Sequence, residues 1–257
     1  MRLKTDSEID AMAVAGRAAA RTLQKMKASL SAGMSTMDLE EIAREELRVQ
    51  GARPALLGYH PRFSSSPYDF ATCISVNDEV IHGQPSPTRI LKEGDVVGMD
   101  LVADVDGWLA DTAITAVLGA ASLKAQRLLS VTQEALRHGI AKAVAGGRMG
   151  DVSSAVQKLV ERNGFGVIRE LSGHGVGSEV HEEGIDVPNF GYPGKGLTLQ
   201  VGMTFCIEPM VTAGSPGIKH RPGDPWAVVT RDGSIGAHFE HTIAITSEGT
   251  RILTSLG

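Results

Sequence analysis

Apolar residues recur at every third or fourth position over two segments near the start of the chain, which is the pattern of amphipathic helices. The first segment follows Thr5 and Glu8, which have the spacing of a capping box at the start of a helix. The second segment begins near Ser35 or Thr36 and ends before Gly51. The pattern therefore predicts two helices ahead of Gly51.

Short apolar runs then replace the helical spacing, and such runs are typical of buried strands. They predict strands at 73–76, 95–105 and 108–117. Asn77 and Asp78 form a turn signal after the first run, and Asp106 and Gly107 separate the other two. The last two strands are therefore expected to form a hairpin.

The second half of the chain repeats this order of helices followed by strands. A long helix is expected from Ser122 through Ile140 toward Gly146, and another from a cap at Asp151 to about Asn163. Further apolar runs predict strands at 166–171, 203–211, 227–230 and 238–246.

One ten-residue segment occurs twice. Residues 91–100 match residues 199–208, because leucine, glycine and a final carboxylate each recur 108 positions later. With the repeated order of elements, this match predicts an α+β fold of two related halves, about 1–120 and 121–257. No linker rich in Pro, Gly or Ser separates the halves, so residues 1–257 are expected to form a single domain.

Composition excludes several classes of protein. Thirty glycines among 257 residues show no G-x-y period, which excludes collagen, and a 42% hydrophobic content with a net charge of −5 excludes disorder. The apolar stretches are far shorter than the ~18–20 residues of a membrane span, and no basic run suggests nucleic-acid binding. Two cysteines and a charged N-terminus without a signal peptide favour the cytoplasm.

Two aspartates carry the first chemical signal. Asp100 and Asp111 each lie inside an apolar strand pattern. A two-residue turn at 106–107 would place Asp111 opposite Val102, on the strand face that also carries Asp100, ~7–8 Å away at the backbone. Crowded carboxylates on a half-buried sheet repel each other, so they need a cation, a shared proton or basic partners.

Glu208 and Glu240 lie in equally apolar strand patterns, and His174 stands between two glycines. Any one of these acids could be an ordinary buried hydrogen-bonding group, but four in matched places favour a divalent metal site. Four carboxylates and one imidazole suit two Mn, Fe, Co or Zn ions ~3.5–4 Å apart. Such a pair lowers the pKa of a bridging water toward ~7, which indicates hydrolysis.

The five residues and their flanking motifs resemble the bacterial type I methionine aminopeptidases. The motifs are Gly-His-Gly-Val-Gly, Val-His-Glu-Glu, Met-Thr-Phe-Cys-Ile-Glu-Pro-Met and Phe-Glu-His-Thr-Ile. This resemblance spans nearly the whole chain and implies a single catalytic domain with the pita-bread fold, in which two pseudo-twofold-related α+β halves surround a dinuclear metal centre.

The resemblance also implies a role for each ligand. Asp100 would bind one divalent ion (Co, Mn, Fe, Zn or Ni), and His174 and Glu208 would bind the other. Asp111 and Glu240 would bridge the two ions. Glu208 would in addition act as general base and acid, taking the proton of the attacking water and returning it to the leaving amine.

Two further histidines match non-ligand positions of the family. His82 would lie near the substrate amine and the scissile amide nitrogen, and His181 would stabilise the carbonyl oxygen as it becomes tetrahedral. The methionine side-chain pocket would be lined by four residues, namely Tyr59, Tyr68, Cys73 and Trp226.

Departures from the family pattern concern specificity. The loop at 60–67 is longer, Val180 stands where a phenylalanine is usual, and Leu56 where a cysteine is common. Loss of an aromatic wall would loosen the pocket or shift its preference by ~1–3 kcal/mol. The chain also lacks the N-terminal extension of longer relatives, so no ribosome-docking segment is evident.

The resemblance thus implies a monomeric cytoplasmic enzyme that removes N-terminal methionine from peptides and nascent chains, at the ribosome among other places, when the next residue is small. The nucleophile would be a hydroxide between the two metals. An Xaa-Pro aminopeptidase or prolidase of the same fold is the alternative enzyme, since it shares all five ligands. A metal-free pita-bread module that binds peptides without cleaving them is the alternative from another class.

Overall fold

The computed structural model describes residues 1–61, 64 and 66–256. The predicted loop at 60–67 includes residues 62, 63 and 65, which lie outside the described residues. The helices are α1 (Asp6–Ser29), α2 (Thr36–Val49), α3 (Leu123–Ile140) and α4 (Met149–Arg162). The strands are β1 (Arg53–Pro54), β2 (Cys73–Val76), β3 (Glu79–Ile81), β4 (Val96–Val105), β5 (Trp108–Val117), β6 (Gly166–Val167), β7 (Ser172–Gly175), β8 (Glu182–Pro188), β9 (Thr204–Ile207), β10 (Met210–Thr212), β11 (Ile218–His220), β12 (Val228–Thr230), β13 (Gly236–His238), β14 (Glu240–Thr246) and β15 (Gly249–Ile252).

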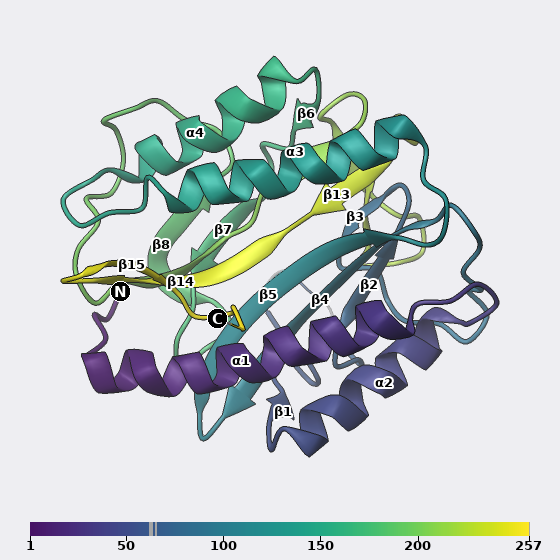
Figure 1. The fold of residues 1–257 in the computed structure, drawn as a ribbon, viewed down its shortest axis with the longest axis horizontal. Helices are drawn as coiled ribbons and strands as arrows, with labels where there is room; N and C mark the ends of the chain where they lie inside the picture. Colours follow the sequence, from purple (N-terminus) through teal and green to yellow (C-terminus); the bar gives the residue numbers. More distant parts are fainter. Residues whose placement is uncertain (62–63, 65, 257) are drawn as a thin grey trace.

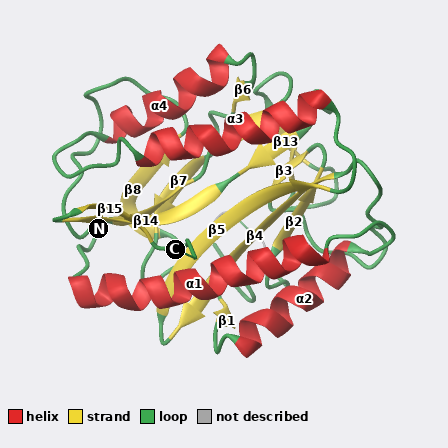
Figure 2. Ribbon diagram, viewed as in Figure 1, coloured by secondary structure: helices red, strands yellow, loops and turns green. Residues whose placement is uncertain are grey.

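One large curved sheet is the centre of the molecule (Figure 2). Its strands follow the order β1-β4-β5-β14-β9-β7-β8, with β2 added on β4 and β15 on β14. Two small sheets, β13-β10-β6 and β11-β12-β3, complete the fold. Among the helices of the described residues, none is long and apolar enough to cross a membrane.

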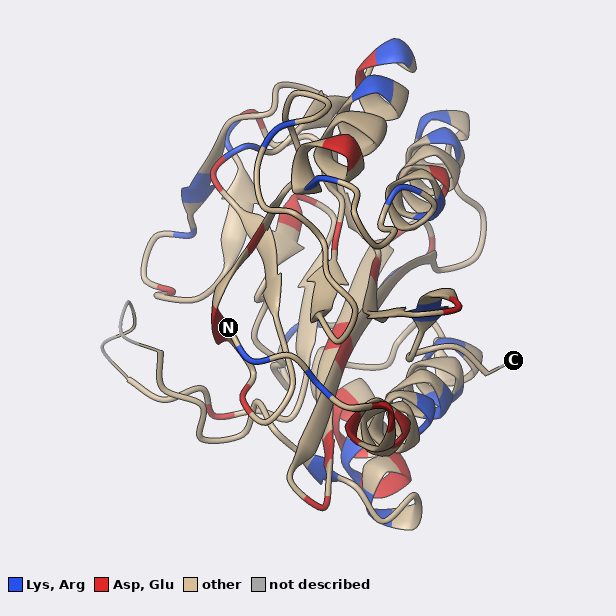
Figure 3. Ribbon diagram, turned by 90° about the vertical axis from the view of Figure 1, so that its left-hand side faces the viewer, with Lys and Arg blue, Asp and Glu red and all other residues tan. Residues whose placement is uncertain are grey.

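The four helices cover one face of the large sheet, α1 and α2 over one end and α3 and α4 over the other (Figures 1 and 3). Leu23 and Leu39 pack on Met99 beneath the first pair of helices, and Leu136 packs on Phe205 beneath the second pair. Because the helices bury this face, the opposite face of the sheet is left for the small sheets and for a cavity.

The two halves repeat each other in detail, as the pita-bread fold requires. Leu91 forms backbone hydrogen bonds to the turn that precedes α2, and Leu199 forms the same pair of bonds to the turn that precedes α4. Gly94 and Gly202 both have positive φ angles, +87° and +91°, which favour glycine. These contacts support the predicted halves, whose boundaries, like the single catalytic domain, remain predictions.

The predicted hairpin is confirmed. Val105 pairs with Trp108, and Val102 lies opposite Asp111. The turn residues 106 and 107 have φ angles of 53° and 84°, the two positive values that a type I′ turn needs. Asp111 is therefore on the same face of the hairpin as Asp100, the predicted metal ligand on β4.

Several predicted elements differ from the structure. The strand expected at 203–211 is split into β9 and β10, because Pro209 has no N–H for a ladder. The strand expected at 238–246 is likewise broken at Phe239, and only Gly166–Val167 of the run at 166–171 is a strand. Residues beside two of these interruptions, Glu208, Met210, His238 and Glu240, line the cavity described below.

The predicted starts of three helices are confirmed, and the predicted cap of the fourth helix is wrong. Thr5, Ser35 and Ser122 are N-caps of α1, α2 and α3, as expected. Asp151 is not the cap of α4: Arg148 is, and the Asp151 carboxylate accepts the backbone N–H of Arg148 from the third helical position. A carboxylate there satisfies the same free amide that a capping box would.

Threonine hydroxyls join the two halves where β5 meets β13 and β14. The Thr242 hydroxyl donates to the Asp111 carbonyl at 2.8 Å and accepts the Asp111 N–H at 2.9 Å. Thr115 makes the same pair of bonds with the backbone of His238, at 2.6 and 3.0 Å. Strands β5 and β14 are paired directly at only two positions, so these hydroxyls extend the seam between the halves.

Candidate metal centre

The structure brings the five predicted ligands together. Asp100 lies on β4, Asp111 on β5, His174 on β7 and Glu240 at the first position of β14, while Glu208 directly follows β9. All five line one cavity of about 790 Å³. Strands of both halves therefore contribute to a single site.

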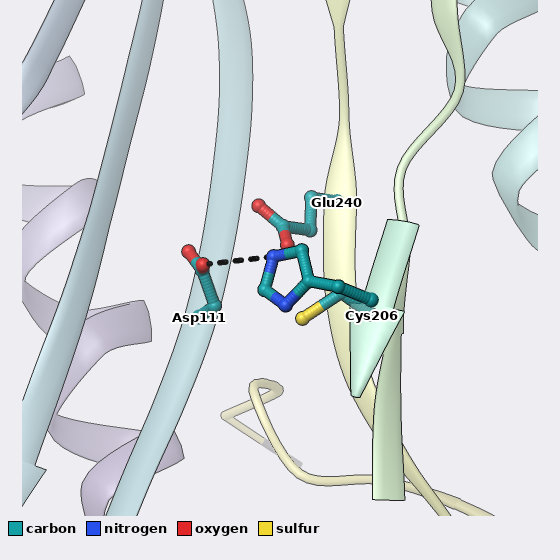
Figure 4. A group of neighbouring side chains, drawn as sticks. Asp111, Cys206 and Glu240 are labelled. Carbon is teal, nitrogen blue, oxygen red and sulfur yellow. Dashed lines mark ion pairs between the residues drawn. The ribbon is translucent and has the colours of Figure 1, made fainter. Parts of the chain in front are cut away.

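The distances within the site are those of a ligand cluster. The Nε2 atom of His174 lies 3.7 Å from Oδ2 of Asp111 and 3.6 Å from Oε1 of Glu208. Figure 4 shows Asp111, Glu240 and Cys206 gathered around this imidazole. Among the described residues, Oδ1 of Asp111 and Oε1 of Glu240 are buried without a hydrogen-bond partner. Unpartnered buried oxygens next to an imidazole fit divalent metal ions.

The electrostatics lead to the same conclusion. Burial, followed by repulsion from the other carboxylates, raises the pKa values of Asp111, Glu208 and Glu240 well above their usual range. Burial likewise raises the pKa of Asp100. It lowers the pKa of His174 to about 3, so this imidazole is neutral and able to donate its lone pair. A bound divalent cation would compensate the charge of these carboxylates.

His82 is held in an uncommon backbone conformation at the end of β3, with φ at +58°. The next residue must be glycine, because a Cβ at Gly83 would lie 2.5 Å from the Ile74 carbonyl oxygen. Burial, and then the nearby His181, lower the pKa of His82 to about 4. His82 lines the cavity as a neutral imidazole.

His181 lies directly before β8 and also lines the cavity. Its ring centroid is 3.8 Å from that of His174, and its Nδ1 atom is 2.7 Å from the Tyr59 hydroxyl. The surrounding protein desolvates this imidazole and lowers its pKa to about 4. Both predicted non-ligand histidines therefore line the cavity of the proposed metal ligands, and His181 is in contact with one of them.

The predicted pocket residues occupy different depths. Cys73 lines the cavity together with Leu56 and Val180. Tyr68 and Trp226 pack behind Cys73, with their ring centroids 4.9 Å apart. Tyr59 borders a neighbouring cavity of about 510 Å³, beside His181. Leu56, Cys73 and Val180 are thus part of the apolar lining of the main cavity, which also includes Ile81, Met210, Ile218 and Val228.

Cys206 is a residue of the site that the sequence analysis missed. It lies two positions before Glu208 on β9, and its Sγ atom belongs to a group with ligand atoms of Asp111, His174 and Glu240, all within 4.8 Å of one another. Alternation along the strand could have found it, because residues two apart share a strand face.

His238 is a second residue of the site that the sequence analysis missed. It lies two positions before Glu240, and its Nε2 atom is 3.4 Å from Oε2 of Glu208. This nitrogen is buried and has no hydrogen-bond partner among the described residues. The break at Phe239 hides the relation, because His238 ends β13 and Glu240 begins β14.

The glycines beside His174 let other strands approach it. A Cβ at Gly173 would lie 2.3 Å from the Cys206 carbonyl oxygen, and one at Gly175 would lie 3.0 Å from the Glu182 carbonyl oxygen. The close approach expected from the glycines is therefore an approach of the β9 and β8 backbones. It places His174 within reach of the carboxylates.

Comparison with known proteins agrees with this geometry. The model of metallopeptidase family M24 matches residues 10–247. A methionine aminopeptidase of Aquifex aeolicus is 44% identical over 100% of this chain and 99% of its own length. The crystal structure of a methionine aminopeptidase from Thermotoga maritima superposes with a TM-score of 0.94, at 42% identity and 99% coverage of both chains.

A more distant structure shares only the fold. A prolidase from Pyrococcus furiosus has a TM-score of 0.76 at 21% identity and covers 99% of this chain, while 66% of the prolidase is matched. Sequence identity and coverage are thus both higher for the methionine aminopeptidases than for the prolidase. With ligands from both halves meeting in one cavity, the chain belongs to metallopeptidase family M24 and, within it, to the bacterial type I methionine aminopeptidases.

Proposed function

We propose that this chain hydrolyses the peptide bond after an N-terminal methionine when the next residue is small. The observation that carries the proposal is the convergence of four carboxylates and one imidazole from both halves on a cavity that also has apolar lining residues. A metal centre beside an apolar wall suits a substrate with a free amine and an unbranched apolar side chain.

Five residues are proposed to hold two divalent ions (Co, Mn, Fe, Zn or Ni), namely Asp100, Asp111, His174, Glu208 and Glu240. Bound ions would lower the pKa of water and polarise the scissile carbonyl. The unpartnered oxygens of Asp111 and Glu240 and the neutral state of His174 support this assignment.

Glu208 is proposed to move the proton during the reaction. Burial and the Asp100 carboxylate raise its pKa well above the ordinary range, which favours a carboxyl group able to accept a proton and to return it. It would take the proton from the attacking water and deliver it to the departing amine.

The two histidines are proposed to act on the peptide itself. His82 would hydrogen-bond near the substrate amine and the scissile nitrogen, and His181 would donate to the carbonyl oxygen as negative charge develops there. Both are neutral at pH 7, because the protein lowers their pKa values to about 4. A neutral imidazole can donate one hydrogen bond from a defined nitrogen.

The methionine side chain is proposed to lie against Leu56, Cys73 and Val180, with Tyr68 and Trp226 supporting Cys73 from behind. Val180 leaves more room than an aromatic side chain would. A linear thioether fits such a pocket because it adapts its shape by rotation about its single bonds.

The finer setting is also proposed. The enzyme would work as a monomer in the cytoplasm, on free peptides and on nascent chains at the ribosome. Both cysteines are free and buried, which suits a reducing compartment.

Initial rates on peptides test the function. With Mn(II) or Co(II) bound, we expect Met-Ala-Ser to be cleaved at least about 100-fold faster than Met-Lys-Ser and faster than Leu-Ala-Ser. Faster cleavage of a peptide with proline second would instead assign a prolidase-like activity. Absence of any cleavage by protein that takes up no metal would assign a binding module.

A further inference from the structure

We propose that Tyr59 is a positioning residue, whose hydroxyl holds His181 in the tautomer that carries its proton on Nε2. This proposal deepens the role suggested above for His181 and rests on it in part. It also gives Tyr59 a task other than lining the methionine pocket.

The contact between the two side chains is close and specific. The Tyr59 hydroxyl lies 2.7 Å from Nδ1 of His181, and the two rings stack with centroids 5.5 Å apart and planes inclined by 17°. The His181 ring also lies 3.8 Å from that of His174. The imidazole therefore contacts both a phenol and a proposed metal ligand.

The backbone holds Tyr59 in place. Its N–H donates to the Leu56 carbonyl at 2.9 Å, and its carbonyl accepts the N–H of the buried Tyr68 at 2.8 Å. The Gly58 N–H donates to the Tyr68 carbonyl at 2.8 Å. These bonds fix the backbone of Tyr59 beside Tyr68, and the stacking of its ring on His181 then brings the hydroxyl to Nδ1.

The direction of the hydrogen bond decides the tautomer. A phenol is a stronger donor than acceptor, because its oxygen lone pair is delocalised into the ring, and the lone pair of a neutral imidazole is the stronger acceptor, so at 2.7 Å the Tyr59 O–H donates to Nδ1. This leaves the only imidazole proton on Nε2. Because the two nitrogens lie on opposite sides of the ring, Nε2–H then points away from Tyr59.

A proton on Nε2 is what the proposed chemistry needs. His181 lines the cavity, and a donor is required where negative charge develops on the carbonyl oxygen. In the other tautomer Nε2 would present a lone pair to that oxygen and repel it. Tyr59 would thus act through His181 without touching the reacting atoms.

The first test is the tautomer itself, measured on the metal-free protein by two-bond ¹H–¹⁵N correlation NMR of labelled histidines. The His181 signals are identified by their loss in His181→Gln. We expect Nε2–H in the wild type and a mixture of tautomers in Tyr59→Phe. Nδ1–H in the wild type, or an unchanged pattern in Tyr59→Phe, would overturn the proposal. This readout does not depend on activity, so it stands even if the proposed function fails.

The second test is kinetic and uses Met-Ala-Ser with the metal-loaded enzyme. Tyr59→Phe should lower kcat about 10-fold with little change in KM, because stacking remains and only the hydroxyl is lost. In a His181→Ala background the same change should have no further effect. Tyr192→Phe, at an exposed tyrosine, is the matched control. A change in KM or in the preference for methionine over leucine, with kcat unchanged, would return Tyr59 to the side-chain pocket and overturn the proposal.

Discussion

Asp111 lies where burial and repulsion are most concentrated. Its carboxylate is repelled by Glu240, Asp100 and Glu208, and one of its oxygens has no hydrogen-bond partner among the described residues. Without a metal this charge destabilises the fold, and with a metal it becomes a ligand. The same residue therefore has opposite effects in the two states.

Replacing Asp111 by asparagine should separate these effects. We expect Asp111→Asn to lower kcat/KM at least about 100-fold and to abolish tight Mn(II) binding. In the metal-free protein the same change should raise the free energy of unfolding by about 1–3 kcal/mol, because it removes a repelling charge. Metal titration calorimetry and chemical denaturation in chelator measure the two results.

Asp104 provides the matched control. It lies on β4, four positions after Asp100 and therefore on the same strand face. It is paired with Arg53 at 2.5 Å and accepts the Gly107 N–H at 2.9 Å. Asp104→Asn should therefore lower stability and leave metal binding unchanged. Stabilisation by both variants would show that the site itself is not the cause.

Residue types and spacing carried much of the site prediction. The four acids were conspicuous because each stands in an apolar strand, and the structure brings them together with His174. Cys206 and His238 were not conspicuous, because a cysteine suits any buried strand and a lone histidine is common. Their place beside the ligands depends on strand pairing and on the break at Phe239, which are properties of the fold.

At the scale of elements, the approach of β7 to β9 depends on a single missing methyl group. A Cβ at Gly173 would lie 2.3 Å from the Cys206 carbonyl oxygen. Gly173→Ala should cost about 1–3 kcal/mol of stability by overpacking and weaken metal binding by shifting His174. Gly98→Ala in β4 is the control: its nearest neighbour would be 3.6 Å away, so the cost should stay below about 1 kcal/mol. Equal losses of stability, measured by denaturation, would contradict this reading.

The turn between β12 and β13 predicts a dependence on pH. The Ser234 hydroxyl and the backbone N–H groups of Ser215 and Ser234 lower the pKa of Asp232 to about 2. A carboxyl group with a lowered pKa stabilises the fold above its unfolded pKa of 3.8, and this contribution is lost as pH falls toward 2. Asp232→Asn should thus be less stable than the wild type at pH 5, and the difference should shrink as pH falls below 3.8 and vanish below pH 2. A difference that stays constant over this range in denaturant titrations would refute the assignment.

Elements with a local signal were predicted best. Capping residues and helical spacing defined α1, α2 and α3, and the turn at 106–107 defined the hairpin. Strand β8 was not predicted, because Glu182, Glu183 and Asp186 give it no apolar run. It is a strand through its pairing with β7, a long-range contact that no local pattern encodes.

At the scale of the whole molecule, the proposed ligands lie on both sides of the seam between the halves. Asp100 and Asp111 belong to the first half, and His174, Glu208 and Glu240 to the second. Metal bound by all five would cross-link the halves. Binding to the folded state alone also stabilises it by mass action.

Addition of metal should therefore raise the melting temperature. Mn(II) at 100 times its Kd should add about 2.7 kcal/mol, or about 5–10 °C for a chain of this length. Excess chelator should reverse the change, and Asp111→Asn should show none of it. A melting temperature that does not respond to Mn(II) in the wild type, measured by calorimetry, would argue against a ligand site shared by the halves.

The internal match between 91–100 and 199–208 was the best guide to the whole fold. In both segments the glycine has a positive φ angle, and the leucine forms the same two backbone hydrogen bonds to the turn before a helix. The repeat in sequence is therefore a repeat in structure. The small sheets were predicted only in part. Strand β12 was expected at 227–230 and β6 lies within the run at 166–171, whereas β3 and β11 were not predicted, because they are short and are defined by their partners.

The hydrogen bonds of the Thr115 and Thr242 hydroxyls along the seam between the halves affect how readily the seam exchanges its amide protons. A hydroxyl changes its hydrogen-bond partner by rotation about one bond, whereas a backbone ladder must break several bonds together. The amide protons of Asp111 and His238, which are bonded to hydroxyls, should then exchange with solvent more readily than their neighbours within the strands. Metal bound by ligands from both halves should slow this exchange, because it holds the two strands of the seam together.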